Sequence, residues 1–105
     1  MPTDDNAQPP LQELFTPRQW ALLTKKLRLS PRQAEIARLI CLGFPNNRIP
    51  SLLQLHDSTV RIHRRALYRK LGIRDRVGVP VTLILAAKRR KLGHKADHLP
   101  RLGEL

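Results

Sequence analysis

The sequence of residues 58–71 is Ser-Thr-Val-Arg-Ile-His-Arg-Arg-Ala-Leu-Tyr-Arg-Lys-Leu. Wound as a helix with about 100° of rotation per residue, this stretch has two faces of different composition. One face carries Ser58, Arg61, Ile62, Arg65 and Arg69. The opposite face carries Val60, His63, Leu67 and Leu71. The apolar face can anchor the helix to a small core. The other face combines arginines with one hydroxyl and one apolar side chain, a mixture suited to base edges in a DNA major groove. DNA binding is therefore the leading hypothesis.

Charge is distributed unevenly along the chain of 105 residues, whose formal net charge is +12. All 20 Lys and Arg residues lie at or after Arg18, whereas Asp4, Asp5 and Glu13 precede it. This balance favours a polyanionic partner, either nucleic acid or an anionic membrane surface. A basic surface that contacts only water is the alternative interpretation.

Other classes of protein find little support in the sequence. The first ten residues are polar, acidic and proline-bearing, unlike a signal or transit peptide. The apolar run at residues 77–87 is too short to span a bilayer. Cys41 is the only cysteine, so an internal disulfide cannot form, and a reducing cytoplasm fits. No Gly-rich phosphate loop, convincing carboxylate pair or Cys-x-x-Cys spacing is present. We therefore predict a cytoplasmic protein that is not an enzyme and uses no cofactor or small-molecule ligand.

Helix boundaries are signalled by repeated capping chemistry. Thr16-Pro-Arg-Gln and Ser30-Pro-Arg-Gln both place a hydroxyl at the cap, Pro at the first helical position and Gln three residues after the cap. These boxes predict helices to about Leu27 and about Leu42, the second stopped by Gly43. A brief helix over residues 47–53 and a tight turn over residues 54–56 should precede the basic helix. A last helix should run from near Asp75 or Val79 to about Arg90.

The expected fold is all-α, with a short helix, a turn and a long basic helix at its centre, which is helix-turn-helix geometry. We divide the chain into a disordered tail (1–15), an additional N-terminal helix (16–28), the helix-turn-helix domain (25–90) and a basic, flexible tail (91–105).

Several segments together resemble the LuxR-type helix-turn-helix domain: residues 29–32, Gly43, residues 45–49, 59–64 and 69–76. The resemblance covers about residues 25–90. It implies a four-helix transcription-regulator domain that binds DNA as a dimer, with the third helix in the groove and the fourth at the dimer contact. In the second helix, Arg48 and Pro50 replace the usual Glu and Ala, and Pro50 is harmless only in the first turn. Gln54 replaces the Gly of the turn, at a cost of roughly 1–2 kcal/mol if that residue is left-handed.

Roles follow from the groove face and from the resemblance. The predicted base contacts are Arg61, Ile62 and Arg65, since Arg can donate to guanine and Ile can meet a thymine methyl. The predicted backbone contacts are Thr59, Arg64, Arg69 and Lys70, with Arg64 extending its stem along the core. His63 is either a packing residue or a phosphate contact. The predicted dimer contacts are Val81, Ile84 and Leu85, unless they only cover the core of a monomer, and Trp20 and Leu23 compete for that role.

Two function classes remain open at this point. One is a sequence-specific DNA-binding transcriptional regulator that pairs as a homodimer on duplex DNA. The other is a protein-interaction adaptor that docks on RNA polymerase or another acidic partner. Trp20 is interpreted as a core residue. His94 and His98 have metal-ligand spacing on a helix, but only Asp97 lies nearby as a further ligand, so we predict no metal site.

Overall fold

The computed structural model describes residues 8–92, with side chains described as far as Arg89. Within this range the chain is all-helical, as predicted, and contains no strand. The elements are α2 (Pro17–Lys26), α3 (Pro31–Cys41), a 3-10 turn η1 (Asn46–Arg48), α4 (Ile49–Leu53), α5 (Asp57–Leu71) and α6 (Gly78–Leu92). None of the helices formed by residues 8–92 has the length and apolar character needed to cross a membrane.

The two predicted capping boxes are both present. At the start of α2, the Gln19 amide donates to Thr16 Oγ1 at 3.1 Å, and the Thr16 amide donates to Gln19 Oε1 at 2.8 Å. At the start of α3, Ser30 and Gln33 make the same reciprocal pair, at 3.1 and 3.0 Å. Each box satisfies two backbone donors that a helix start leaves unpaired, so these local sequences fix where α2 and α3 begin.

The ends of α2, α3, α4 and α5 share one geometry, in which a left-handed residue reverses the chain. The left-handed residues are Arg28 (φ 58°), Gly43 (φ 90°), Gln54 (φ 58°) and Gly72 (φ 71°). After α4, for example, the amide of Leu55 donates to the Pro50 carbonyl at 2.9 Å. Gln54 thus adopts the left-handed conformation, which is strained for a residue with a side chain. Pro50 lies in the first turn of α4, where a proline does not break the helix.

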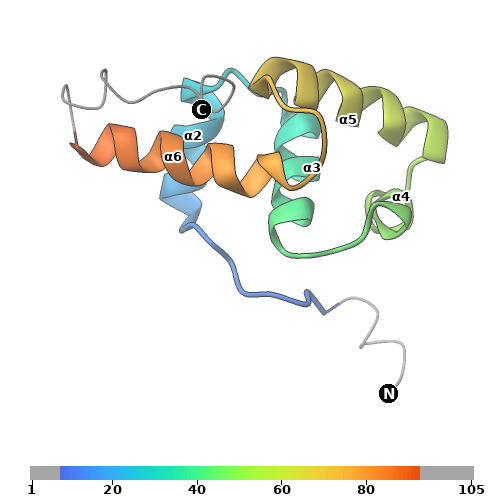
Figure 1. Ribbon diagram of the computed structural model, residues 1–105. Coiled ribbons are helices and arrows are strands. Elements are labelled where there is room, and N and C mark those ends of the chain that lie inside the picture. The colour runs from blue at the N-terminus through green and yellow to red at the C-terminus, as the bar shows by residue number, and fades with distance from the viewer. Residues whose placement is uncertain (1–7, 93–105) are drawn as a thin grey trace.

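The core forms where α3 lies between α5 and α6 (Figure 1). Ile36 of α3, Leu67 of α5 and Leu83 of α6 are each fully buried there. Burying a side chain of this size contributes about 1.5–3 kcal/mol relative to leaving it exposed. Because Val60 and Leu67 are both buried on α5, the rotation of that helix about its axis is fixed by the core.

The N-terminal segment differs from the prediction of a disordered tail over residues 1–15. Residues 8–15 run along the domain below α3 (Figure 1). The Leu11 amide donates to the Leu42 carbonyl at 3.0 Å, and Glu13 forms an ion pair with Arg38. Phe15 is buried and meets Trp20 edge to face, with 5.6 Å between ring centroids. A segment without helical period can still pack when one side chain, here Phe15, enters the core. Residues 1–7 and 93–105, including His94 and His98, lie outside the described residues.

Candidate nucleic-acid interface

The three predicted base-contacting residues lie together on the outer face of α5. Arg61 and Arg65 are exposed, and Ile62 is 67% exposed despite its apolar side chain. On the opposite face, Val60 and Leu67 are fully buried. The core therefore holds α5 in a rotation that presents Arg61, Ile62 and Arg65 to solvent. We call these three residues the reading face.

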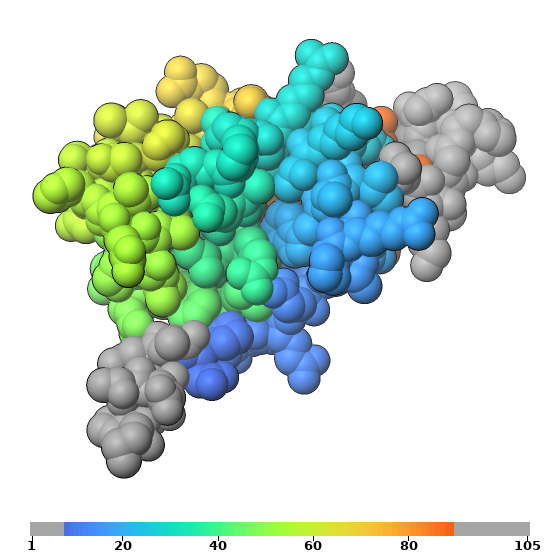
Figure 2. All heavy atoms as spheres, turned by 180° about the vertical axis from the view of Figure 1, so that it is seen from behind, coloured from blue at the N-terminus to red at the C-terminus, as the bar shows by residue number. Residues whose placement is uncertain are grey.

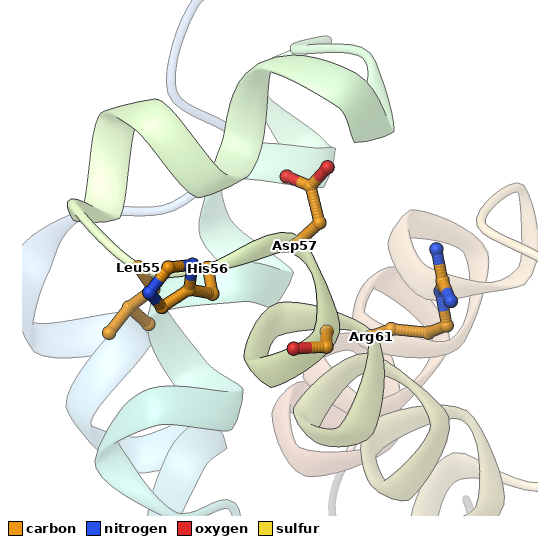
Figure 3. Close-up of a pocket in the computed structure, with 5 residues that line it drawn as sticks. Leu55, His56, Asp57 and Arg61 are labelled. Atoms are coloured by element: carbon orange, nitrogen blue, oxygen red, sulfur yellow. The ribbon is translucent and has the colours of Figure 1, made fainter.

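The first turn of α5 lies open beside the turn that follows α4. Leu55, His56, Asp57, Ser58 and Arg61 line a hollow there. Figure 3 shows the His56 and Arg61 side chains extending to different sides, with Asp57 between them at the helix start. His56 precedes the helix but its side chain makes no capping hydrogen bond. The Asp57 carboxylate lies in this first turn, beside the positive end of the α5 dipole, and lines the hollow together with Arg61, so charges of both signs meet at the start of α5.

The predicted backbone-contacting residues divide into two groups. Thr59 and Arg64 are half-buried at the edges of the core, whereas Arg69 and Lys70 are exposed near the end of α5. Lys70 already has a partner, because its ammonium donates to the Arg28 carbonyl at 2.6 Å. An ammonium group has three N–H donors, so this bond leaves two for other acceptors.

Few acidic groups neutralise this surface. Among the described residues, the ion pairs are Arg32–Glu35 and Arg38–Glu13, and neither involves α5. The positive charges of the reading face are therefore available to an anionic partner. Burial raises the pKa of Tyr68, an effect that the Arg64 and Arg76 charges oppose, so this phenol stays neutral and subtracts nothing from the charge of α5.

Arg76 has a structural role that the sequence does not predict. Its guanidinium donates to Asn46 Oδ1 at 2.7 Å and to the Phe44 carbonyl at 2.6 Å. These bonds tie the α5–α6 loop to the 3-10 turn that leads into α4. Arg76 therefore helps to set α4 against α5, the two helices of the helix-turn-helix unit. The sequence signal was only its place at the end of the 69–76 segment that carries the family resemblance.

The outer side of α6 carries the predicted dimer contacts. Val81 is 40% exposed, Ile84 is 36% exposed and Leu85 is half-buried. Ile84 also lines a hollow between α6 and the N-terminal part of the chain. Of the two competing residues, Leu23 is buried in the core and Trp20 is half-buried against Phe15, so Leu23 is not available at the surface.

In the described part of the chain, no three His, Cys, Asp or Glu side chains come together in a way that could hold a metal ion. The thiol of Cys41 is buried, and burial raises its pKa to about 12. Such a thiol remains protonated near neutral pH and is a poor nucleophile or metal ligand.

Comparison with known proteins agrees with the geometry. The family model of the luxR family of bacterial regulatory proteins matches residues 27–82, more than half of the chain, and the chain belongs to this family. The matched residues include α3, η1, α4 and α5 and end within α6, whereas α2 precedes them. The family resemblance and the all-α helix-turn-helix fold expected from the sequence are thus confirmed.

Two relatives from Escherichia coli strain K12 are similar to this chain. It is 35% identical over 54 residues to the nitrate/nitrite response regulator protein NarL, covering 51% of this chain and 25% of NarL. It is 32% identical over 56 residues to the nitrate/nitrite response regulator protein NarP, covering 53% of this chain and 26% of NarP. The chain thus spans about a quarter of the length of these relatives. No solved structure matched the chain.

Proposed function

We propose that this chain binds duplex DNA sequence-specifically through α5 and thereby regulates transcription. The observation that carries the proposal is the reading face, where Arg61 and Arg65 flank Ile62 on a helix whose opposite side is locked into the core. Guanine offers two acceptors to an Arg fork in the major groove, and the thymine methyl offers an apolar contact to Ile62. Membership of a family of regulatory proteins supports the same function.

The remaining parts of the proposal concern the phosphates. Thr59, Arg64, Arg69 and Lys70 flank the reading face and would contact the DNA backbone, which fixes register without reading sequence. Residues 25–90 would form the DNA-binding unit, with α2 as an addition to it. Since the proposed partner is chromosomal DNA, we place the chain in the bacterial cytoplasm, and no catalytic step is needed.

We further propose that two copies pair on DNA through the outer side of α6. A single recognition helix contacts only a few base pairs, too few to select one site among those of a genome. A second copy related by two-fold symmetry would read an inverted half-site about 10 bp away, centre to centre. The exposure of Val81 and Ile84 supports this surface.

The alternative, an adaptor docking on RNA polymerase through the basic face, is less well supported. An acidic protein surface would need the charges of Arg61 and Arg65 but gives no reason for an exposed Ile62 between them. Family membership also favours the DNA-binding function.

The test begins with a duplex selected by the full chain from a random pool, and binding is measured by fluorescence anisotropy. Arg61→Ala and Arg65→Ala should each weaken binding to the selected duplex by roughly 1–3 kcal/mol and relax discrimination at one base pair. Arg18→Ala, at the start of α2, removes the same charge away from α5 and should leave discrimination intact. Uniform loss of affinity for all sequences in both α5 variants would contradict our assignment of the reading face.

Salt dependence tests the electrostatic part of the proposal separately. If one copy neutralises roughly 4–6 phosphates, log affinity should fall with log salt at a slope of about −4 to −5, doubled for two copies. An adaptor would bind all duplexes weakly or none. A flat salt dependence on the selected duplex would contradict the backbone contacts.

A further inference from the structure

Four basic side chains gather where α2 turns into α3, and we call them the corner cluster. They are Lys25, Lys26, Arg28 and Arg32. No acidic residue occurs between Lys25 and Arg32 in the sequence. Lys25, Lys26 and Arg28 are exposed, and no acidic side chain of the described residues pairs with them, whereas Arg32 pairs with Glu35. The family match begins only at residue 27, so this cluster straddles the edge of the shared domain.

The corner cluster lies beside the C-terminal end of α5. The bond from the Lys70 ammonium to the Arg28 carbonyl, at 2.6 Å, joins the two places directly. Figure 1 shows the α2–α3 connection next to that end of α5, while α4 lies beside the other end. In Figure 2, cyan side chains from this part of the chain project from the surface near the yellow end of α5. The basic surface of α5 therefore continues onto the corner cluster.

The backbone at Arg28 gives a second, independent observation. Arg28 has φ of 58° and closes α2, with its amide donating to the Lys25 carbonyl at 3.2 Å and the Leu29 amide donating to the Thr24 carbonyl at 2.9 Å. Gly43 and Gly72 close α3 and α5 in the same way. Glycine is the least strained residue at such a position. The chain instead carries an arginine there, although no hydrogen bond or ion pair of the Arg28 side chain stabilises the described part of the fold.

We propose that the corner cluster contacts the DNA phosphates beyond the C-terminal end of α5, on the backbone that borders the groove read by that helix. The inference rests on the proposed function, because it uses the docking of α5. α5 has 15 residues and is therefore about 22 Å long, whereas a major groove is about 12 Å wide, so a helix lying across the groove extends beyond it and the elements beside its ends meet the bordering backbones. On this geometry, α4 serves one flank and the corner cluster serves the other.

The key variant is Arg28→Gly, which removes the charge and relieves the backbone strain together. It keeps the carbonyl that accepts the Lys70 bond. We expect a higher thermal midpoint of unfolding, and yet binding to the selected duplex and to the random pool weaker by about fivefold near physiological salt, with a salt slope shallower by about 1. Lys25→Gln and Lys26→Gln should shift the salt slope in the same direction without stabilising the fold.

Two matched controls separate strain from charge. Gln54→Gly relieves the same φ of 58° after α4 without changing charge, and it should raise the midpoint while leaving the salt slope unchanged. Arg18→Gln removes a charge at the far end of α2 and should change the salt slope less than Arg28→Gly does. Extending the selected duplex on the flank beyond α5 should strengthen binding of the parent chain more than binding of Arg28→Gly.

The outcomes distinguish this inference from the proposed function. If Arg28→Gly is stabilised and binds both probes with the salt slope of the parent, the corner cluster does not contact DNA. In that case, loss of discrimination in Arg61→Ala would still support the reading face. If the parent chain binds no duplex at any salt concentration, both proposals fail together.

Discussion

Arg76 illustrates how a single side chain can position a whole element. Its two hydrogen bonds hold the Asn46 amide and the Phe44 carbonyl in a partly buried place. Arg76→Ala would leave both acceptors without these donors, at an expected cost of about 1–3 kcal/mol in the free energy of unfolding. Urea unfolding measures this cost. Arg74→Ala, a loop arginine that is exposed, is the control and should change stability little. Equal effects of the two substitutions would show that the Arg76 bonds contribute nothing.

Because of Cys41, we expect the free energy of unfolding to depend on pH under alkaline conditions. Burial, and secondarily the Glu13 charge, raise the pKa of this thiol from 9.0 to about 12, while Arg76 acts in the opposite direction. Between these pKa values the unfolded chain releases the thiol proton and the native chain keeps it. The free energy of unfolding therefore falls as pH rises above 9.0, by at most about 1.4 kcal/mol per pH unit for one group.

Urea unfolding as a function of pH measures this effect. Cys41→Ala should lower stability at neutral pH through lost packing but show a shallower alkaline decline than the parent chain. Tyr68, whose pKa is raised above 10.0, adds a decline of the same sign at higher pH. If Cys41→Ala declines as steeply as the parent between about pH 8 and pH 10, the thiol is not the titrating group.

For single residues, the sequence predicts which side chains of a helix are exposed and which are buried, because this depends on the helical period. The exposure of Arg61, Ile62 and Arg65 opposite Val60 and Leu67 follows from that period alone. The bonds of Arg76 and Lys70 could not be predicted in the same way. Their acceptors lie 30 to 42 residues away in sequence, two of them are backbone carbonyls, and no pattern of side chains marks such partners.

At the element scale, short-range chemistry predicts helix starts better than helix interiors. The boxes at Thr16 and Ser30 lie where the sequence places them. The segment predicted as one short helix over residues 47–53 is instead a 3-10 turn followed by α4. Pro50 explains the difference, because it lacks the N–H that would continue α-helical bonding backward to Asn46. The Arg48 amide bonds instead to the Pro45 carbonyl, at 3.0 Å.

The turn between α4 and α5 offers an element-scale prediction. Gln54 holds φ of 58° and is exposed, so its side chain adds strain without packing. Gln54→Gly should raise the free energy of unfolding, by up to about 1 kcal/mol after the extra flexibility of glycine in the unfolded chain is counted. Thermal and urea unfolding should agree. Gln54→Ala keeps the strain and serves as the control, and a similar gain in both variants would contradict the strain argument.

In the molecule as a whole, the packing of the N-terminal segment against the domain was the feature that the sequence predicted least well. Phe15 enters the core from a segment without periodicity, and Leu11 packs so close to Gly43 that a Cβ there would lie 3.0 Å from its Cγ. Contacts of this kind depend on where distant segments meet, which neither capping chemistry nor hydrophobic period encodes. The limits assigned to the C-terminal tail and to the DNA-binding unit stay predictions.

Pairing on DNA belongs to the same scale. Val81→Lys places a charge on the proposed contact between copies and should reduce the complex on a palindromic duplex from two copies to one. Affinity for the palindromic duplex should fall by about 100-fold or more, because a bound copy no longer holds the second copy next to its half-site. Val77→Lys is a matched control, since Val77 is 68% exposed but precedes α6. Analytical ultracentrifugation gives the stoichiometry, and an unchanged two-copy complex in Val81→Lys would reject this surface.

The reading face is separate from the core, so its side chains can be exchanged without disturbing the fold. Arg61, Ile62 and Arg65 are exposed, and no hydrogen bond or ion pair of their side chains contributes to the described fold. Exposed helix positions of this kind tolerate exchange at costs within about 0.5 kcal/mol. On the proposed function, exchanges at these three positions should change the DNA sequence that the domain selects while leaving its free energy of unfolding nearly constant.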